Sequence, residues 1–238
     1  MPEKTGGDNP SHDNPDNNPA QNENEYLLRR IAVYIIGLFV LAFGVALSIN
    51  ADLGISPVSS LPFVFSLILD ADMGIVVPMT FMVMILLQII LLRKKFKLIN
   101  LTQIVFSVIF GYFVDAARII IGDFQIPTYF GQLLLLLCGI VLIASGVILT
   151  VRPKLVPLPL EGLVVAIVRV FPNRKFHIVK IIADSALVAL AVAASIIFLG
   201  RLHAIREGTV LTAVFVGKVI PYIEKVALPV LVRFKIIE

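Results

Sequence analysis

The stretch LGISPVSSLP, Leu53 to Pro62, lies between two long hydrophobic runs of the chain. It holds two prolines, three serines and a glycine, which suit a lipid-facing helix poorly because proline removes a backbone donor and disrupts the helix. The chain nevertheless continues into the apolar FVFSLIL, residues 63–69. The stretch therefore predicts one of three structures: a short span, an external loop, or a re-entrant segment that enters the membrane and turns back.

The composition identifies the class of protein. Hydrophobic residues make up 58% of the 238 residues and charged residues only 15%. A soluble domain cannot bury that much apolar surface, so we expect an all-α polytopic membrane protein whose main partner is the lipid bilayer. The net charge of +4 does not indicate nucleic-acid binding, because the basic residues lie in short clusters beside apolar runs.

Eight apolar runs follow a polar N-terminal segment, residues 1–25, which we expect to be a disordered cytoplasmic tail. Six runs approach the roughly 20 residues that cross about 30 Å of hydrocarbon, and two are shorter and broken by prolines near their starts. The six are Leu27–Ile49, Ile75–Leu92, Leu101–Ile121, Phe130–Val151, Ile178–Leu199 and Gly208–Leu228; the two are Leu53–Leu69 and Leu155–Phe171.

The placement of charge decides between these structures, because basic clusters belong on the cytoplasmic side. If all eight runs spanned the membrane, the basic RKKFK (93–97) would be outside and the acidic DADMG (70–74) inside, which is the reverse of this rule. If the two short runs are re-entrant, the basic clusters fall inside, and only the loop with Arg201, His203 and Arg206 is an exception. We therefore expect six spans, two re-entrant segments and cytoplasmic termini, with 229–238 as a C-terminal tail.

The chain also matches itself at a fixed shift. Identical residues occur at Gly37/Gly139, Ala42/Ala144, Gly44/Gly146, Val45/Val147, Leu47/Leu149, Leu53/Leu155, Pro57/Pro159 and Leu61/Leu163, and Gly111 matches Gly217 at a slightly larger shift. The match predicts two repeats, 26–123 and 130–228, each made of a span, a re-entrant segment and two spans. Since three spans is an odd number, the second repeat is expected to be inverted, as in many transporters.

Five segments carry a family resemblance: LGISPVSSLPFVFSLIL (53–69), FGYFVDAAR (110–118), PLPLEGLVVAI (157–167), VKIIADSALV (179–188) and REGTVLTAVFVGKVI (206–220). Together they resemble the YczE/YyaS/YitT family of bacterial membrane proteins, from about Tyr26 to Ile223. The resemblance implies a protein of the bacterial cytoplasmic membrane, with a poorly defined activity. Relatives often have Trp-Asp where this chain has Val58-Ser59, so no role of that Asp carries over.

The first re-entrant segment is expected to begin a half-helix. Ser56 is the predicted N-cap and Pro57 the first helical residue, with Ser59 and Ser60 in the opening turn. The helix N-terminus would favour an anion near the middle of the membrane. The serines either contact a substrate or only satisfy the backbone of a packing turn.

In the second re-entrant segment Pro159 takes the place of Pro57, and Glu161 aligns with Ser59. Glu161 is either a structural cap of the helix or a functional group, because an ionisable side chain at membrane depth is costly.

Further charged residues lie within the spans. Asp184 and Lys218 have a similar expected depth and are predicted to pair, with Glu161 nearby; Lys180, four residues before Asp184, is the competing partner.

Other polar residues are secondary candidates. Asp115 and Arg118 form either a local pair or an outer counterpart of the inner cluster, while Glu207 and Thr209 suit the start of the last span. Gly44, Gly146, Gly111 and Gly217 are expected to serve helix packing, because small residues let helix backbones approach closely.

The motifs of common enzyme classes are not found, and His177 and His203 are expected on opposite faces, so we expect no enzyme, cofactor or metal site. The leading hypothesis is a small secondary transporter or channel for an anionic or zwitterionic solute, with Glu161 or Asp184 coupling to a proton or other ion. The alternative is a membrane scaffold or regulator that acts through partner proteins.

Overall fold

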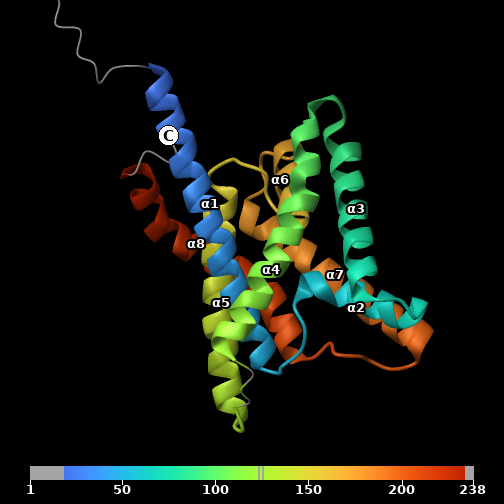
Figure 1. Ribbon diagram of the computed structural model, residues 1–238. Helices are drawn as coiled ribbons and strands as arrows, with labels where there is room; N and C mark the ends of the chain where they lie inside the picture. Colours follow the sequence, from blue (N-terminus) through green and yellow to red (C-terminus); the bar gives the residue numbers. More distant parts are fainter. Residues whose placement is uncertain (1–18, 123, 125, 234–238) are drawn as a thin grey trace, which may run out of the picture.

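The computed structural model describes residues 19–122, 124 and 126–233 (Figure 1). Within these residues the chain is helical and contains no strand. The helices are α1 (Pro19–Asn50), α2 (Pro57–Leu69), α3 (Met73–Leu92), α4 (Gln103–Ile121), α5 (Tyr129–Val151), α6 (Pro159–Val170), α7 (Phe176–Leu199) and α8 (Glu207–Arg233), with 3₁₀ turns at Arg93–Lys95 and Leu98–Thr102.

The all-α class predicted from the sequence is confirmed, and each apolar run coincides with one helix. Two boundaries differ from the expected ones. Helix α1 begins at Pro19, within the segment 1–25 that was assigned to a disordered tail, and α8 ends at Arg233, beyond the expected start of the C-terminal tail. The rest of the two predicted tails, residues 1–18 and 234–238, lies outside the described residues.

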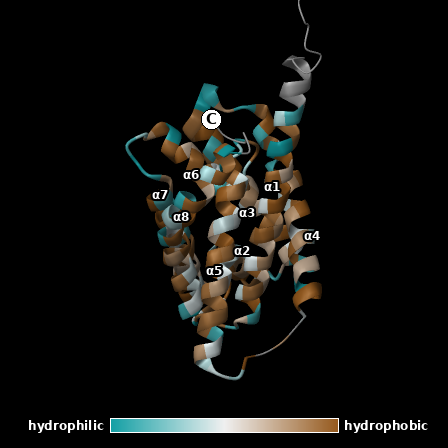
Figure 2. Cartoon of the chain, turned by 90° about the vertical axis from the view of Figure 1, so that its left-hand side faces the viewer, coloured by the Kyte–Doolittle hydropathy of each residue, from teal (hydrophilic) through white to brown (hydrophobic). Residues whose placement is uncertain are grey.

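Five of the described helices are long and apolar enough to cross a membrane: α1, α3, α4, α5 and α7. Their outward faces are hydrophobic, with Ile119 82% and Ile90 67% exposed, as a lipid environment requires (Figure 2). Helix α8 is also long, but it carries three charged residues within its apolar sequence, Lys218, Glu224 and Lys225.

The helices pack in pairs. Helix α1 packs along α5, and each of the two has a second long neighbour: α4 lies against α1, and α8 lies against α5. The short helix α2 packs on α7, and the short helix α6 packs on α3. In Figure 1, α1 descends from the N-terminal side while α5 ascends beside it, and α2 and α6 lie toward opposite ends of the molecule.

Glycines bring α1 and α5 into backbone contact. A Cβ at Gly146 would lie 2.6 Å from the backbone nitrogen of Leu41, and a Cβ at Gly44 would lie 2.7 Å from that of Ile143. Real Cβ atoms do not approach other atoms so closely, so even alanine does not fit at either position. Gly44 and Gly146 thus lie where α1 and α5 approach each other most closely, as a packing role requires.

The loops that lead into α2 and α6 are held by other parts of the chain. Before α6, the Tyr34 hydroxyl donates to the Val156 carbonyl at 2.7 Å. Before α2, the Gly208 amide donates to the Leu53 carbonyl at 2.8 Å. Gly54 has φ +119°, and its Cα lies against Thr209, where a Cβ would meet Oγ1 at 2.6 Å. These contacts fix where each short helix begins.

Candidate functional site

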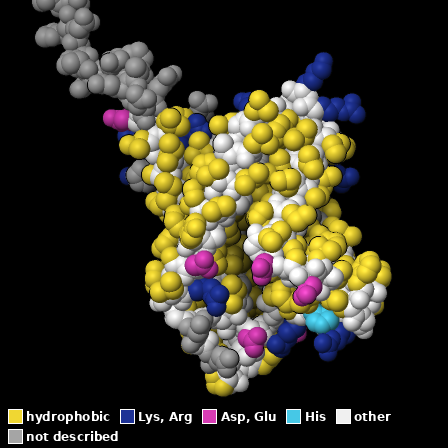
Figure 3. Space-filling view, turned by 45° about the vertical axis from the view of Figure 1, so that its right-hand side comes forward, with side chains coloured by type: hydrophobic (Ala, Val, Ile, Leu, Met, Phe, Trp, Pro, Cys, Tyr) yellow, Lys and Arg dark blue, Asp and Glu magenta, His cyan; other side chains and the backbone are white. Residues whose placement is uncertain are grey.

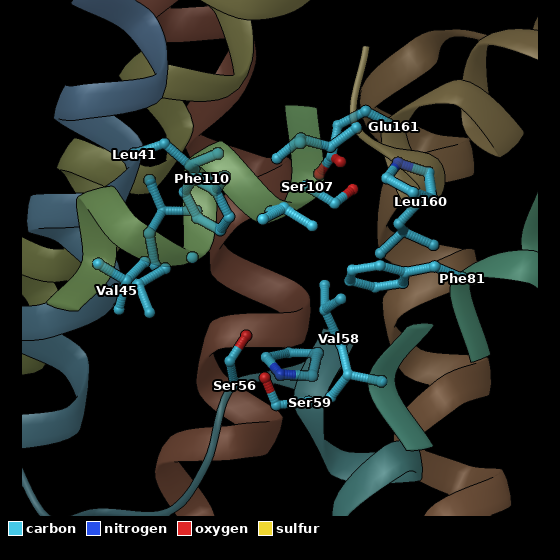
Figure 4. A pocket seen from close by; sticks show the side chains of 18 of the residues that line it. Leu41, Val45, Ser56, Val58, Ser59, Phe81, Ser107, Phe110, Leu160 and Glu161 are labelled. Atoms are coloured by element: carbon cyan, nitrogen blue, oxygen red, sulfur yellow. The ribbon is translucent and has the colours of Figure 1, made fainter. Parts of the chain in front are cut away.

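A cavity of about 710 Å³ lies where the N-terminal ends of the two short helices face the interior. Residues 56–59 at the start of α2 line one side, and residues 158–161 at the start of α6 line another. In Figure 4, Ser56 and Ser59 lie on one side of the cavity and Glu161 on the other, with Val58, Phe81 and Leu160 between them.

The cavity is open between α3 and α4. Its lining there includes Ile104 and Val108, which are 39% and 53% exposed. Figure 3 shows this side of the surface as largely hydrophobic and divided by a hollow, with acidic and basic side chains near its lower end. Because α3 and α4 are both able to cross a membrane, the opening lies at a face suited to lipid.

The start of α2 follows the sequence prediction in position but not in its hydrogen bonds. Ser56 is the N-cap residue and Pro57 is the first residue of the helix, but the Ser56 side chain makes no capping hydrogen bond. Ser56 and Ser59 line the cavity instead. Ser60 is fully buried, and its hydroxyl donates to the Pro57 carbonyl at 2.6 Å, which gives it a role within the helix.

A cluster of three buried charged side chains lies in the cavity wall. Lys180 Nζ donates to Glu161 Oε1 at 3.1 Å and to Asp184 Oδ1 at 2.9 Å. Lys180 and Asp184 lie one turn apart on α7, and Glu161 comes from the first turn of α6. Each side chain is at most 8% exposed, so water contributes little to their stabilisation and the pairing itself must offset the cost of burial.

The predicted pair of Asp184 and Lys218 is wrong. The partner of Asp184 is Lys180, the competing candidate. Lys218 is exposed on α8, where its ammonium group lies 5.2 Å from the centre of the Phe215 ring. The reason is the rotation of α8. Gly217 faces α7, where Ile181 leaves no room for a Cβ, and the next residue therefore points away from α7.

The secondary candidates divide into two groups. Asp115, Arg118 and Gly111 of α4 line the cavity. Gly111 does not serve close packing as expected, because a Cβ there would meet nothing within 4 Å. Glu207 is exposed and pairs with Arg206, and Thr209 is buried at the start of α8, so neither belongs to the cavity wall.

Sequence reasoning missed a pair of buried amides. Gln88 of α3 and Gln103 of α4 exchange hydrogen bonds of 3.0 and 2.9 Å, and Gln88 also donates to the Pro159 carbonyl at 3.0 Å. Both side chains pack against Gly162, where a Cβ would lie 2.9 Å from Gln88 Oε1. The signal was present, since each glutamine lies in or beside an apolar run, where an isolated polar residue needs a partner.

A family model described as a family of unknown function, DUF6198, matches residues 28–225. The chain belongs to the DUF6198 family. The DUF6198 match includes every residue that lines the cavity, from Leu41 to Val216. Neither the search of curated proteins nor the search of solved structures found a match. The resemblance to the YczE/YyaS/YitT family stays a prediction.

Proposed function

We propose that this DUF6198 protein is a small secondary transporter or channel for a zwitterionic or anionic solute. The observation that carries the proposal is the cavity, which combines the N-terminal turns of two short helices with buried charged side chains. Charged groups at membrane depth are costly to keep and are typical of substrate and ion pathways. Glu161 and Asp184 are the candidates for coupling to a proton.

The proposed architecture is six spans, with α2 and α6 as re-entrant half-helices in two inverted repeats. The pairing of helices supports it, because exchanging the two sets of four helices turns each contact into another observed contact. The pair α1–α4 corresponds to α5–α8, and α2–α7 corresponds to α6–α3. The opposite directions of α1 and α5 in Figure 1 agree with an inverted second repeat.

Cysteine labelling tests this topology. In a Cys138→Ser background, Asp72→Cys is expected to react with a membrane-impermeant thiol reagent only from outside the cell, and Asn173→Cys only from the cytoplasm. Both positions are exposed in the loops before α3 and α7, so the reagent can reach them. Labelling of position 72 from the cytoplasm would contradict the re-entrant assignment of α2.

Transport is tested with purified protein in liposomes, assayed for uptake or exchange against a broad panel of small metabolites. Gly111→Leu is expected to abolish the flux, because it adds a side chain to the cavity at a position where nothing opposes it. Leucine is also a better helix former than glycine, by about 1 kcal/mol, so the variant is expected to remain folded.

The control is Tyr222→Leu, a surface change on α8 away from the cavity. Gly74→Leu would not serve as a control for flux, because Gly74 also lines the cavity. Protein that moves no solute of the panel in either direction would count against a transporter. Flux that survives Gly111→Leu unchanged would show that the solute does not pass through this cavity.

A further inference from the structure

The charge balance of the buried cluster is uneven. Lys180 supplies one ammonium group against the two carboxylates of Glu161 and Asp184. The other charged residues of the cavity wall, Asp115 and Arg118, have opposite formal charges and leave this excess unchanged. An excess charge in a buried site is costly, so the cluster favours uptake of one positive charge, either a proton or a cationic group.

The geometry shows where that positive charge would bind. Lys180 contacts one oxygen of each carboxylate, Oε1 of Glu161 and Oδ1 of Asp184. A carboxylate accepts hydrogen bonds through both oxygens, so the second oxygen of each is left for another donor. Both residues line the cavity, so a donor in the cavity is placed to supply these bonds.

The rest of the cavity wall selects the body of the ligand. Val58, Phe81 and Leu160 lie between the two polar sides of the cavity (Figure 4), and Phe110 lines it as well. The opening between α3 and α4 is lined by exposed aliphatic side chains. An apolar wall with a few placed polar groups is typical of a site for an amphipathic small molecule.

We propose that the cavity binds an amphipathic amine, whose ammonium group displaces a proton from the Glu161–Asp184 pair. This inference rests on the proposed transport function, but it replaces the anionic solute by solutes that carry an ammonium group. One ammonium group enters as one carboxylic acid proton leaves to solvent, so the charge of the cluster together with that ammonium group is the same before and after. Zwitterions with an apolar side group belong to the class, with their carboxylate toward Ser56 and Ser59.

Three probes that share a phenylalkyl body test the proposal: phenethylamine, phenylalanine and 3-phenylpropanoate. Binding to the full-length protein in detergent is measured by calorimetry in two buffers of different ionisation enthalpy, which reports the protons released. Phenethylamine and phenylalanine are expected to bind and to release up to one proton each. Their affinity should fall up to tenfold per pH unit on acidification, where the proton competes for the same carboxylates.

The variants separate the cluster from the rest of the protein. Asp184→Asn keeps the shape of the side chain and an oxygen acceptor for Lys180, but it makes the cluster neutral. Amine binding is therefore expected to weaken at least tenfold, and the release of a proton on binding is expected to be lost. Glu161→Gln is the second isosteric variant and is expected to act in the same way. Glu224→Gln is the control, because that carboxylate pairs with Arg152 away from the cavity, and it should leave amine binding unchanged.

Two results would overturn the inference: binding of 3-phenylpropanoate alone, or amine binding that releases no proton and is unaffected by Asp184→Asn. If none of the three probes binds while the liposomes carry another solute, the inference fails and the transport function stands. If the probes bind with proton release but no solute crosses the liposome membrane, the transport function fails and the binding site stands.

Discussion

Replacing Lys180 with methionine is expected to lower the free energy of unfolding by about 3–5 kcal/mol, because it leaves two carboxylates buried without their counter-ion. Lys180 donates to both Glu161 and Asp184, so no remaining partner in the described residues replaces it. The measurement is denaturant unfolding of the purified protein in detergent, compared with the unchanged chain.

Two further variants make this result specific. Lys218→Met removes an exposed lysine from α8 and is expected to change stability little. Adding Glu161→Gln and Asp184→Asn to Lys180→Met removes the uncompensated charges and should recover most of the loss. If Lys180→Met proved as stable as Lys218→Met, the buried cluster could not be the ionic contact that the structure shows.

Replacing Gly146 with leucine is expected to give the second large effect, a loss of about 3 kcal/mol or more, with a low yield of folded protein. The new side chain would have to occupy the space of the Leu41 backbone, which cannot move aside as a flexible side chain can. Overpacking a well-packed interior usually costs about 1–3 kcal/mol, and a backbone clash lies at the upper end of that range or beyond.

Gly111→Leu is the matched control for this experiment, because the same substitution in another apolar helix meets open space. The two variants are compared by thermal unfolding in detergent. Equal unfolding temperatures would mean that α1 and α5 do not approach each other through Gly146.

The sequence predicted helix positions well because their signal is local. Long apolar runs interrupted by prolines and charges mark their own ends, and Pro57 and Pro159 begin α2 and α6 as expected. The glycines of α1 and α5 were also readable, since residues seven apart lie on one side of a helix.

The cluster in the cavity was only partly predictable. The depth of a residue along a helix follows from its number, and the numbers place Asp184 and Lys218 at a similar depth. The direction in which Lys218 points depends instead on the rotation of α8 about its axis, which the contact between Gly217 and α7 determines. That contact joins separate helices and has no local signal. Lys180 was recognisable as the alternative because a spacing of four residues brings side chains together within one helix.

The contacts at the start of each short helix join distant parts of the chain. The carbonyl of Pro159 in α6 is bound by Gln88, from the part synthesised earlier, and the carbonyl of Leu53 before α2 is bound by Gly208, from the part synthesised later. The first four helices and the last four therefore each depend on the other set for a hydrogen-bond partner. During biosynthesis we therefore expect the loop before α2 to reach its final structure only after α8 has emerged.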